Sequence, residues 1–132
     1  MPSSEPDTLP QDKTPSIRVL AMPANTNASG DIFGGWLMSQ VDIAGSIAAH
    51  RRANGRVVTV AVNQFEFIKP VYVGDLVSIF TEIERIGNTS ITISCTAFAE
   101  LERNAIELDR VATATLTYVA IDENRKPRTI GG

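Results

Sequence analysis

Residues 34 to 50, GGWLMSQVDIAGSIAAH, form the central helix that this sequence predicts. It contains no proline, and Arg51 and Arg52 follow it, cations that favour the C-terminus of a helix. Larger apolar side chains gather on one side of the expected helix, small residues recur on another, and neither side is strongly polar. Helices of this kind are buried, so we expect the rest of the fold and a partner to enclose it.

The sequence around this helix is typical of β-structure. Residues 16 to 22 are short and apolar, and residues 23 to 35 are rich in Asn, Ser and Gly, as loops are. After Gly55, stretches with a period of two are separated by turn residues. The expected strands span 57 to 67, 76 to 86, 90 to 100 and 111 to 121. The predicted fold class is α+β, an antiparallel sheet wrapped around one helix, with two protomers pairing to cover the sheet.

Length and composition indicate one domain. The chain has 132 residues, about the length of one domain. Residues 1 to 15 contain four of its seven prolines among polar groups, so we expect a disordered tail there and a single domain at residues 16 to 132. The net charge of -3 argues against charge-driven nucleic-acid binding. The sequence shows no signal peptide, and no apolar run approaches the length of a membrane span. We therefore expect a cytoplasmic protein.

Most familiar catalytic motifs are absent from the sequence. It has no phosphate-binding loop, no nucleophile elbow and no metal-binding helix motif. One cysteine, Cys95, and one histidine, His50, cannot build a four-ligand zinc site or an intrachain disulfide. We expect no metal, and a structural role for Cys95 within a strand.

Asp42 is the anomaly of the helix. It is the only charged residue between Asp31 and Arg51, and its neighbours on the same stripe are small enough to let another group approach. A carboxylate in apolar surroundings is costly to ionise unless it is paired, and such carboxylates serve as general bases. The alternative is an ordinary capping or ion-paired aspartate on an exposed helix face.

The loop before the helix is the second candidate. Gly34 and Gly35 stand where the first helical N–H groups lack internal partners, which suits an oxyanion hole for an acyl carbonyl. The alternative is a glycine turn with Asn and Ser side chains capping the backbone, and Asp31 is expected to cap.

The remaining candidates are His50 and a group of basic residues. His50 lies eight residues after Asp42, about 12 Å along the helix and about 80° around it, so the two cannot share one site within a protomer. A basic cluster at Arg125, Lys126 and Arg128, together with Arg85, fits the phosphates of a nucleotide-bearing substrate. The alternative is a solvated set of charges.

These motifs resemble a known family. Residues 22 to 36, MPANTNASGDIFGGW, and 39 to 45, SQVDIAG, closely resemble the YciA-type acyl-CoA thioesterases of the hotdog superfamily. So do the segments RVVTVAV at 56 to 62, FIKP at 67 to 70 and VGD at 73 to 75. The resemblance runs from about residue 18 to residue 130.

The resemblance implies an arrangement of the site. Asp42 would be the catalytic carboxylate, either general base or nucleophile, and Asn27 would face it from the other protomer of a dimer, often within a trimer of dimers. Amides around Gly34 and Gly35 would polarise the thioester carbonyl. The resemblance implies substrate-binding roles for Thr59, Arg85, Asn88, Ser90, Arg125 and Arg128. Coenzyme A would be part of the substrate, with no retained cofactor.

The expected function is therefore hydrolysis of acyl-CoA to free CoA and a fatty acid. One alternative is a non-hydrolytic module that binds or senses acyl-CoA, in which Asp42 is merely tolerated. Another is a hotdog dehydratase or hydratase, which the position of the only histidine disfavours. Neither the sequence nor the resemblance indicates the acyl chain length.

Overall fold

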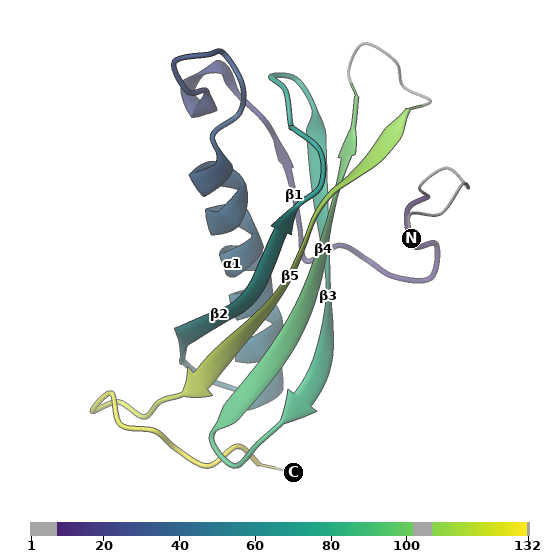
Figure 1. Ribbon diagram of the computed structural model, residues 1–132. Coiled ribbons are helices and arrows are strands. Elements are labelled where there is room, and N and C mark those ends of the chain that lie inside the picture. The colour runs from purple at the N-terminus through teal and green to yellow at the C-terminus, as the bar shows by residue number, and fades with distance from the viewer. Residues whose placement is uncertain (1–7, 102–106, 132) are drawn as a thin grey trace.

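The computed structural model describes residues 8–101 and 107–131 and shows one long helix packed on one antiparallel sheet (Figure 1). The elements in chain order are β1 (Ile17–Leu20), a 3-10 turn (Pro23–Asn25), α1 (Gly34–Ala53), β2 (Val57–Phe67), β3 (Leu76–Ile86), β4 (Ser90–Glu100) and β5 (Leu108–Ala120). The predicted α+β class and the order of the elements are confirmed. Within the described residues, no helix is long and apolar enough to cross a membrane.

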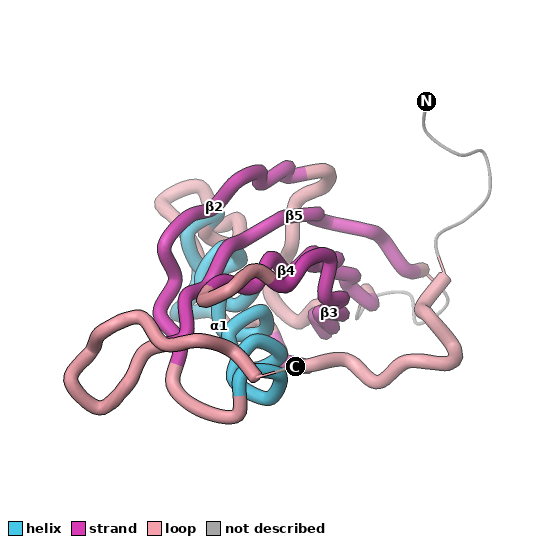
Figure 2. Tube along the Cα trace, turned by 90° about the horizontal axis from the view of Figure 1, so that it is seen from below, coloured by secondary structure: helices cyan, strands magenta, loops and turns pink. Residues whose placement is uncertain are grey.

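The sheet order is β1-β3-β4-β5-β2, with every neighbouring pair antiparallel. Viewed from below, the strands curve around α1, so the helix lies in the hollow of the sheet (Figure 2). β3, β4 and β5 lie inside the sheet, and β1 and β2 form its edges. β5 begins three residues earlier than the sequence predicts, because Asp109 and Arg110 already pair with Ala99 and Phe98 before the apolar alternation begins.

The core forms between the helix and the three inner strands, β3, β4 and β5. Alternate residues of β4 and β5 face α1, as their period of two predicts, and their side chains are almost fully buried. The helix meets them with a face of mostly small residues: Leu37, Val41, Ala44, Gly45, Ala49 and Ala53. Met38 and Ile43 lie on its outer side with 37% and 47% of their surface exposed. The single chain therefore leaves one apolar side of α1 uncovered.

The C-terminal end of α1 is held by the last segment of the chain. Asn54 ends the helix in the left-handed conformation, with φ of 53°. The guanidinium of Arg128 donates from Nη2 to the carbonyl of Ala53 at 2.7 Å and from Nε to the carbonyl of Ile121 at 3.2 Å. Arg128 therefore gives a helix C-terminus both a hydrogen bond and a positive charge.

Replacing Arg128 by methionine is expected to lower the free energy of unfolding by about 1 to 3 kcal/mol, because two carbonyls lose a charged donor. Urea denaturation measures this change. Arg125→Met is the matched control, since Arg125 is exposed in the neighbouring turn, and it should leave the free energy of unfolding unchanged. Equal stability of the two variants would contradict the capping role.

Candidate active site

Asp42 lies in the middle of α1, half-buried, on the side that faces β2 and β5. Its Oδ1 accepts a hydrogen bond from Thr59 Oγ1 on β2 at 2.7 Å and one from the hydroxyl of Tyr118 on β5 at 3.1 Å. Two strands that are far apart in sequence therefore hold the same carboxylate oxygen. Thr59, which the resemblance implies as a substrate-binding residue, is here a hydrogen-bond donor to Asp42.

The second carboxylate oxygen of Asp42, Oδ2, has a different environment from Oδ1. No hydrogen bond within the described residues reaches Oδ2 of Asp42. Among those residues, no buried side-chain nitrogen or oxygen is left without a partner, so Oδ2 must be in contact with solvent. Asp42 thus presents one fixed oxygen to the protein and one open oxygen to the outside.

Tyr118 is a residue of this site that the sequence patterns did not indicate. Its alternation in β5 predicted an inward side chain, and the ring is fully buried. The signal that could have found it is Gly45, one turn after Asp42. A Cβ built on Gly45 would lie 2.3 Å from the Tyr118 hydroxyl oxygen. The group that approaches Asp42 over the small Gly45 is the Tyr118 side chain of the same chain.

Two weak acids lie near Asp42. Burial, followed by the charge of Asp42, raises the pKa of Cys95 to about 12. The same two causes raise the pKa of Tyr118 from its ordinary value of 10.0, so the phenol stays protonated and remains a hydrogen-bond donor. Cys95 is buried on β4 and is held as a thiol, which supports its structural role because the thiolate is the nucleophilic form.

At the start of α1, two backbone N–H groups have no backbone acceptor among the described residues. The carbonyl of Phe33, the N-cap residue, accepts from the N–H groups of Trp36 at 3.0 Å and Leu37 at 3.3 Å. The amides of Gly34 and Gly35 precede these pairs and have no carbonyl within the helix to bond. Asp31 was expected to cap, but the N-cap position belongs to Phe33 and has no side-chain hydrogen bond.

Asn27 lies in the exposed loop before the helix. Its Oδ1 accepts from the backbone N–H groups of Ser29 at 2.9 Å and Asp31 at 3.2 Å. These bonds fix the orientation of the side-chain amide, because only the oxygen can accept from an N–H group. The NH₂ group of Asn27 is consequently the part that can donate to a group outside the loop.

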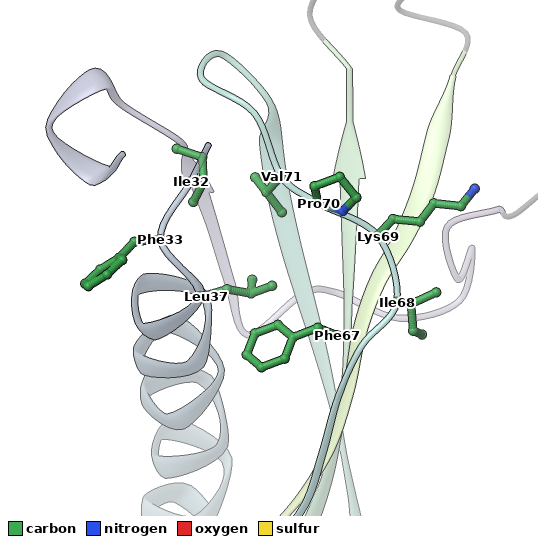
Figure 3. Close-up of a pocket in the computed structure, with 9 residues that line it drawn as sticks. Ile32, Phe33, Leu37, Phe67, Ile68, Lys69, Pro70 and Val71 are labelled. Atoms are coloured by element: carbon green, nitrogen blue, oxygen red, sulfur yellow. The ribbon is translucent and has the colours of Figure 1, made fainter. Parts of the chain in front are cut away.

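An apolar cavity of about 300 Å³ lies beside the first turn of α1 (Figure 3). Gly34 lines it, together with Phe33, Leu37 and Phe67. Lys69 also borders it, but its side chain points away from the cavity and its ammonium group lies 3.1 Å from Asp109. The interior of the cavity therefore has little charge.

The expected phosphate-binding residues lie at the other end of α1. Arg85, Asn88 and Ser90 lie at the β3–β4 turn, and the end of the chain passes beside it, where the Ile130 N–H donates to the Asn88 carbonyl at 2.9 Å. Arg125 lies earlier in this segment, in a turn where its N–H donates to the Asp122 carbonyl. Arg128 belongs to this group, but two of its guanidinium nitrogens donate to backbone carbonyls. The predicted residues therefore divide into three places along the helix: its start, its middle and its end.

His50 stands apart from Asp42. It is exposed near the end of α1, where its backbone carbonyl accepts from the N–H groups of Asn54 and Gly55. The described residues contain no group of three or more His, Cys, Asp or Glu side chains that could hold a metal ion.

The comparison with family models identifies the class of protein. The model of the thioesterase superfamily matches residues 29–106, more than half of the chain. The chain belongs to the thioesterase superfamily, and its five-stranded sheet around one helix is the hotdog fold of the structures that it resembles.

Individual relatives narrow this class. The acyl-CoA thioester hydrolase YciA of Escherichia coli is 47% identical over 116 residues, which cover 86% of this chain and 88% of YciA. The hexameric thioesterase y2039 from Yersinia pestis is 47% identical with a TM-score of 0.87, covering 94% of this chain and 99% of that one. An aspartate-to-alanine mutant of HI0827, a hexameric broad specificity acyl-coenzyme A thioesterase, is 44% identical with a TM-score of 0.85, covering 89% and 86%. The predicted resemblance to YciA-type thioesterases is confirmed.

Proposed function

We propose that this protein hydrolyses acyl-CoA thioesters to free CoA and a carboxylic acid, with Asp42 as the reacting carboxylate. The proposal depends on the different environments of the two carboxylate oxygens of Asp42. Thr59 and Tyr118 both donate hydrogen bonds to Oδ1, whereas Oδ2 is open to solvent. A carboxylate prepared in this way, in a chain of the thioesterase superfamily, has a free oxygen for chemistry.

Two routes use that oxygen. As a general base, Oδ2 takes a proton from water while the water oxygen attacks the thioester carbonyl carbon. As a nucleophile, Oδ2 itself attacks, an anhydride forms, and water then cleaves it. In both routes the carbon–sulfur bond breaks and the CoA thiolate gains a proton, so the sum is one water consumed and one acid and one thiol released.

The amides at the start of α1 are the proposed donors to the carbonyl oxygen. Gly35 lies seven residues before Asp42, within about 20° of the same helix face and about 10 Å along the axis, whereas Gly34 is about 80° away. Because helical side chains tilt toward the helix N-terminus, Oδ2 lies closer to the Gly35 amide than this axial separation. A thioester carbonyl group fits between Oδ2 and the Gly35 amide. The apolar cavity beside Gly34 suits the acyl chain.

A second protomer completes the site in this proposal. β2 is an edge strand of eleven residues, and Val60 and Val62 on it are 54% and 44% exposed. Long apolar edges of this kind usually pair or are covered. Pairing through β2 and the outer side of α1 forms a dimer in which Asn27 donates its NH₂ group to the site of its neighbour, and three dimers form a hexamer.

The CoA portion needs no resident cofactor beside it. Arg85 and Arg125 are exposed cations that can bind its phosphates, with Asn88 and Ser90 as uncharged donors, and Arg128 adds the guanidinium donors that the backbone does not use. These residues are proposed substrate contacts, and coenzyme A leaves as product.

Release of free thiol from acyl-CoA tests the function. The purified protein is mixed with acyl-CoA of several chain lengths and a chromogenic thiol reagent, and its own thiol, buried Cys95, contributes little background. We expect turnover that continues well beyond one equivalent per chain. Binding of acyl-CoA without thiol release would contradict hydrolysis and would favour a module that only binds acyl-CoA.

A further inference from the structure

The hydroxyl of Tyr118 makes two contacts with the same residue. It lies 3.1 Å from Oδ1 of Asp42 and 2.9 Å from the backbone carbonyl oxygen of Asp42. A phenol carries one proton, so this proton is shared between the two acceptors. The hydroxyl therefore ties the carboxylate to its own main chain and restricts rotation of the side chain.

Thr59 alone does not impose this restriction. Its hydroxyl sits on the edge strand β2, next to an irregularity between Thr59 and Ala61, and its single bond leaves the plane of the carboxylate free to turn. Tyr118 comes from a central strand, is fully buried and has a ring with few rotamers. Together the two donors define the plane of the carboxylate and direct its other oxygen outward.

We propose that Tyr118 is a positioning residue for thioester hydrolysis, and that Gly45 is the residue that admits it. The proposal concerns the geometry of Asp42 and assigns Tyr118 no contact with substrate. It rests on the proposed function, and the experiments below separate a failure of one from a failure of the other.

Gly45 supports this assignment independently. A Cβ there would lie 2.3 Å from the hydroxyl oxygen of Tyr118 and 3.0 and 3.1 Å from two ring carbons. Any larger residue at this position pushes the ring and its hydroxyl away from Asp42. A glycine in the middle of a helix lowers helix stability relative to alanine, so its presence here is explained by the close approach of the tyrosine.

Tyr118→Phe is the first test, because it keeps the ring and removes only the hydroxyl. We expect kcat for acyl-CoA hydrolysis to fall about 10-fold to 100-fold while KM changes less than about 2-fold, since a misdirected carboxylate weakens the chemical step and leaves substrate contacts intact. Tyr72→Phe is the matched control, as Tyr72 is the other tyrosine of the chain and is 37% exposed. It should keep the wild-type kcat and KM.

Gly45→Ala and the double variant Gly45→Ala/Tyr118→Phe are the second test. The single alanine should lower both the melting temperature and kcat. Removing the hydroxyl as well relieves the closest clash, so the double variant should recover part of the melting temperature while its kcat stays as low as that of Tyr118→Phe. Stability and activity then respond in opposite ways, which a purely structural role cannot produce.

The outcomes separate the two proposals. A wild-type protein without thiol release contradicts the proposed function. An active wild type with an equally active Tyr118→Phe variant overturns the positioning role, and so does a double variant that regains wild-type kcat. A Tyr118→Phe protein that does not fold would also overturn it, because the hydroxyl would then serve stability.

Discussion

Replacing Asp42 by asparagine is expected to lower kcat for acyl-CoA hydrolysis by about 10²-fold to 10⁴-fold, the range that a general base or nucleophile contributes. Asparagine offers the same shape and the same acceptor oxygen. Because Thr59 and Tyr118 both donate to Oδ1, the variant should keep that oxygen in place and turn its NH₂ group to the open position. An amide there can neither accept a proton from water nor attack a carbonyl.

This substitution should leave the fold intact. Both hydrogen bonds to Oδ1 survive, so the melting temperature should stay close to that of the wild type, and acyl-CoA should still bind. The measurement pairs steady-state thiol release with equilibrium binding of acyl-CoA. Asp12→Asn, in the exposed N-terminal region, serves as control and should be fully active. An Asp42→Asn enzyme with more than about a tenth of the wild-type kcat would remove Asp42 from the chemistry.

Mixing two inactive variants is expected to restore activity. If Asn27 serves the site of its neighbour, Asn27→Ala and Asp42→Asn each damage both sites of a dimer. After random exchange of equal amounts, half of the dimers are mixed, and each mixed dimer contains one intact site. The activity should therefore rise to about a quarter of the wild-type value.

Subunit exchange must be verified independently. Distinct affinity tags on the two variants allow the mixed oligomers to be isolated and assayed directly. The loop around Asn27 is exposed, so the alanine variant should remain folded, which its melting temperature checks. Isolated mixed oligomers that stay inactive would show that Asn27 and Asp42 act within one protomer or that Asn27 has no part in hydrolysis.

Much of the fold could be predicted from the sequence because its periodicities are clear. The start of the helix at Gly34 and the strands at 57–67, 76–86 and 90–100 follow from proline, glycine and the alternation of apolar residues. The end of the helix at Ala53 and the start of β5 at Leu108 did not follow, since backbone pairing there continues through charged residues.

The candidate site could be predicted only in part from the sequence. Asp42 is conspicuous in the sequence as an isolated charge. The alternation in a strand, however, predicts only which side of the sheet a side chain lies on, and not which turn of the helix it contacts. The alternation in β5 therefore predicts that Tyr118 points inward, but it does not predict the hydrogen bond to Asp42. The same limit applies to Arg128, whose guanidinium donates to Ala53 across 75 positions of sequence. Contacts of this length depend on how the sheet curves around the helix.

A crystal structure of the Asp42→Asn protein with bound, uncleaved acyl-CoA would show where the thioester lies relative to residue 42. We expect the thioester carbonyl carbon about 3 to 3.5 Å from the side-chain nitrogen of residue 42, with the carbonyl oxygen at the amides of Gly34 and Gly35 and the partner's Asn27 within hydrogen-bond distance of the site. A thioester bound away from residue 42, or a site with no contribution from a second protomer, would contradict this expectation.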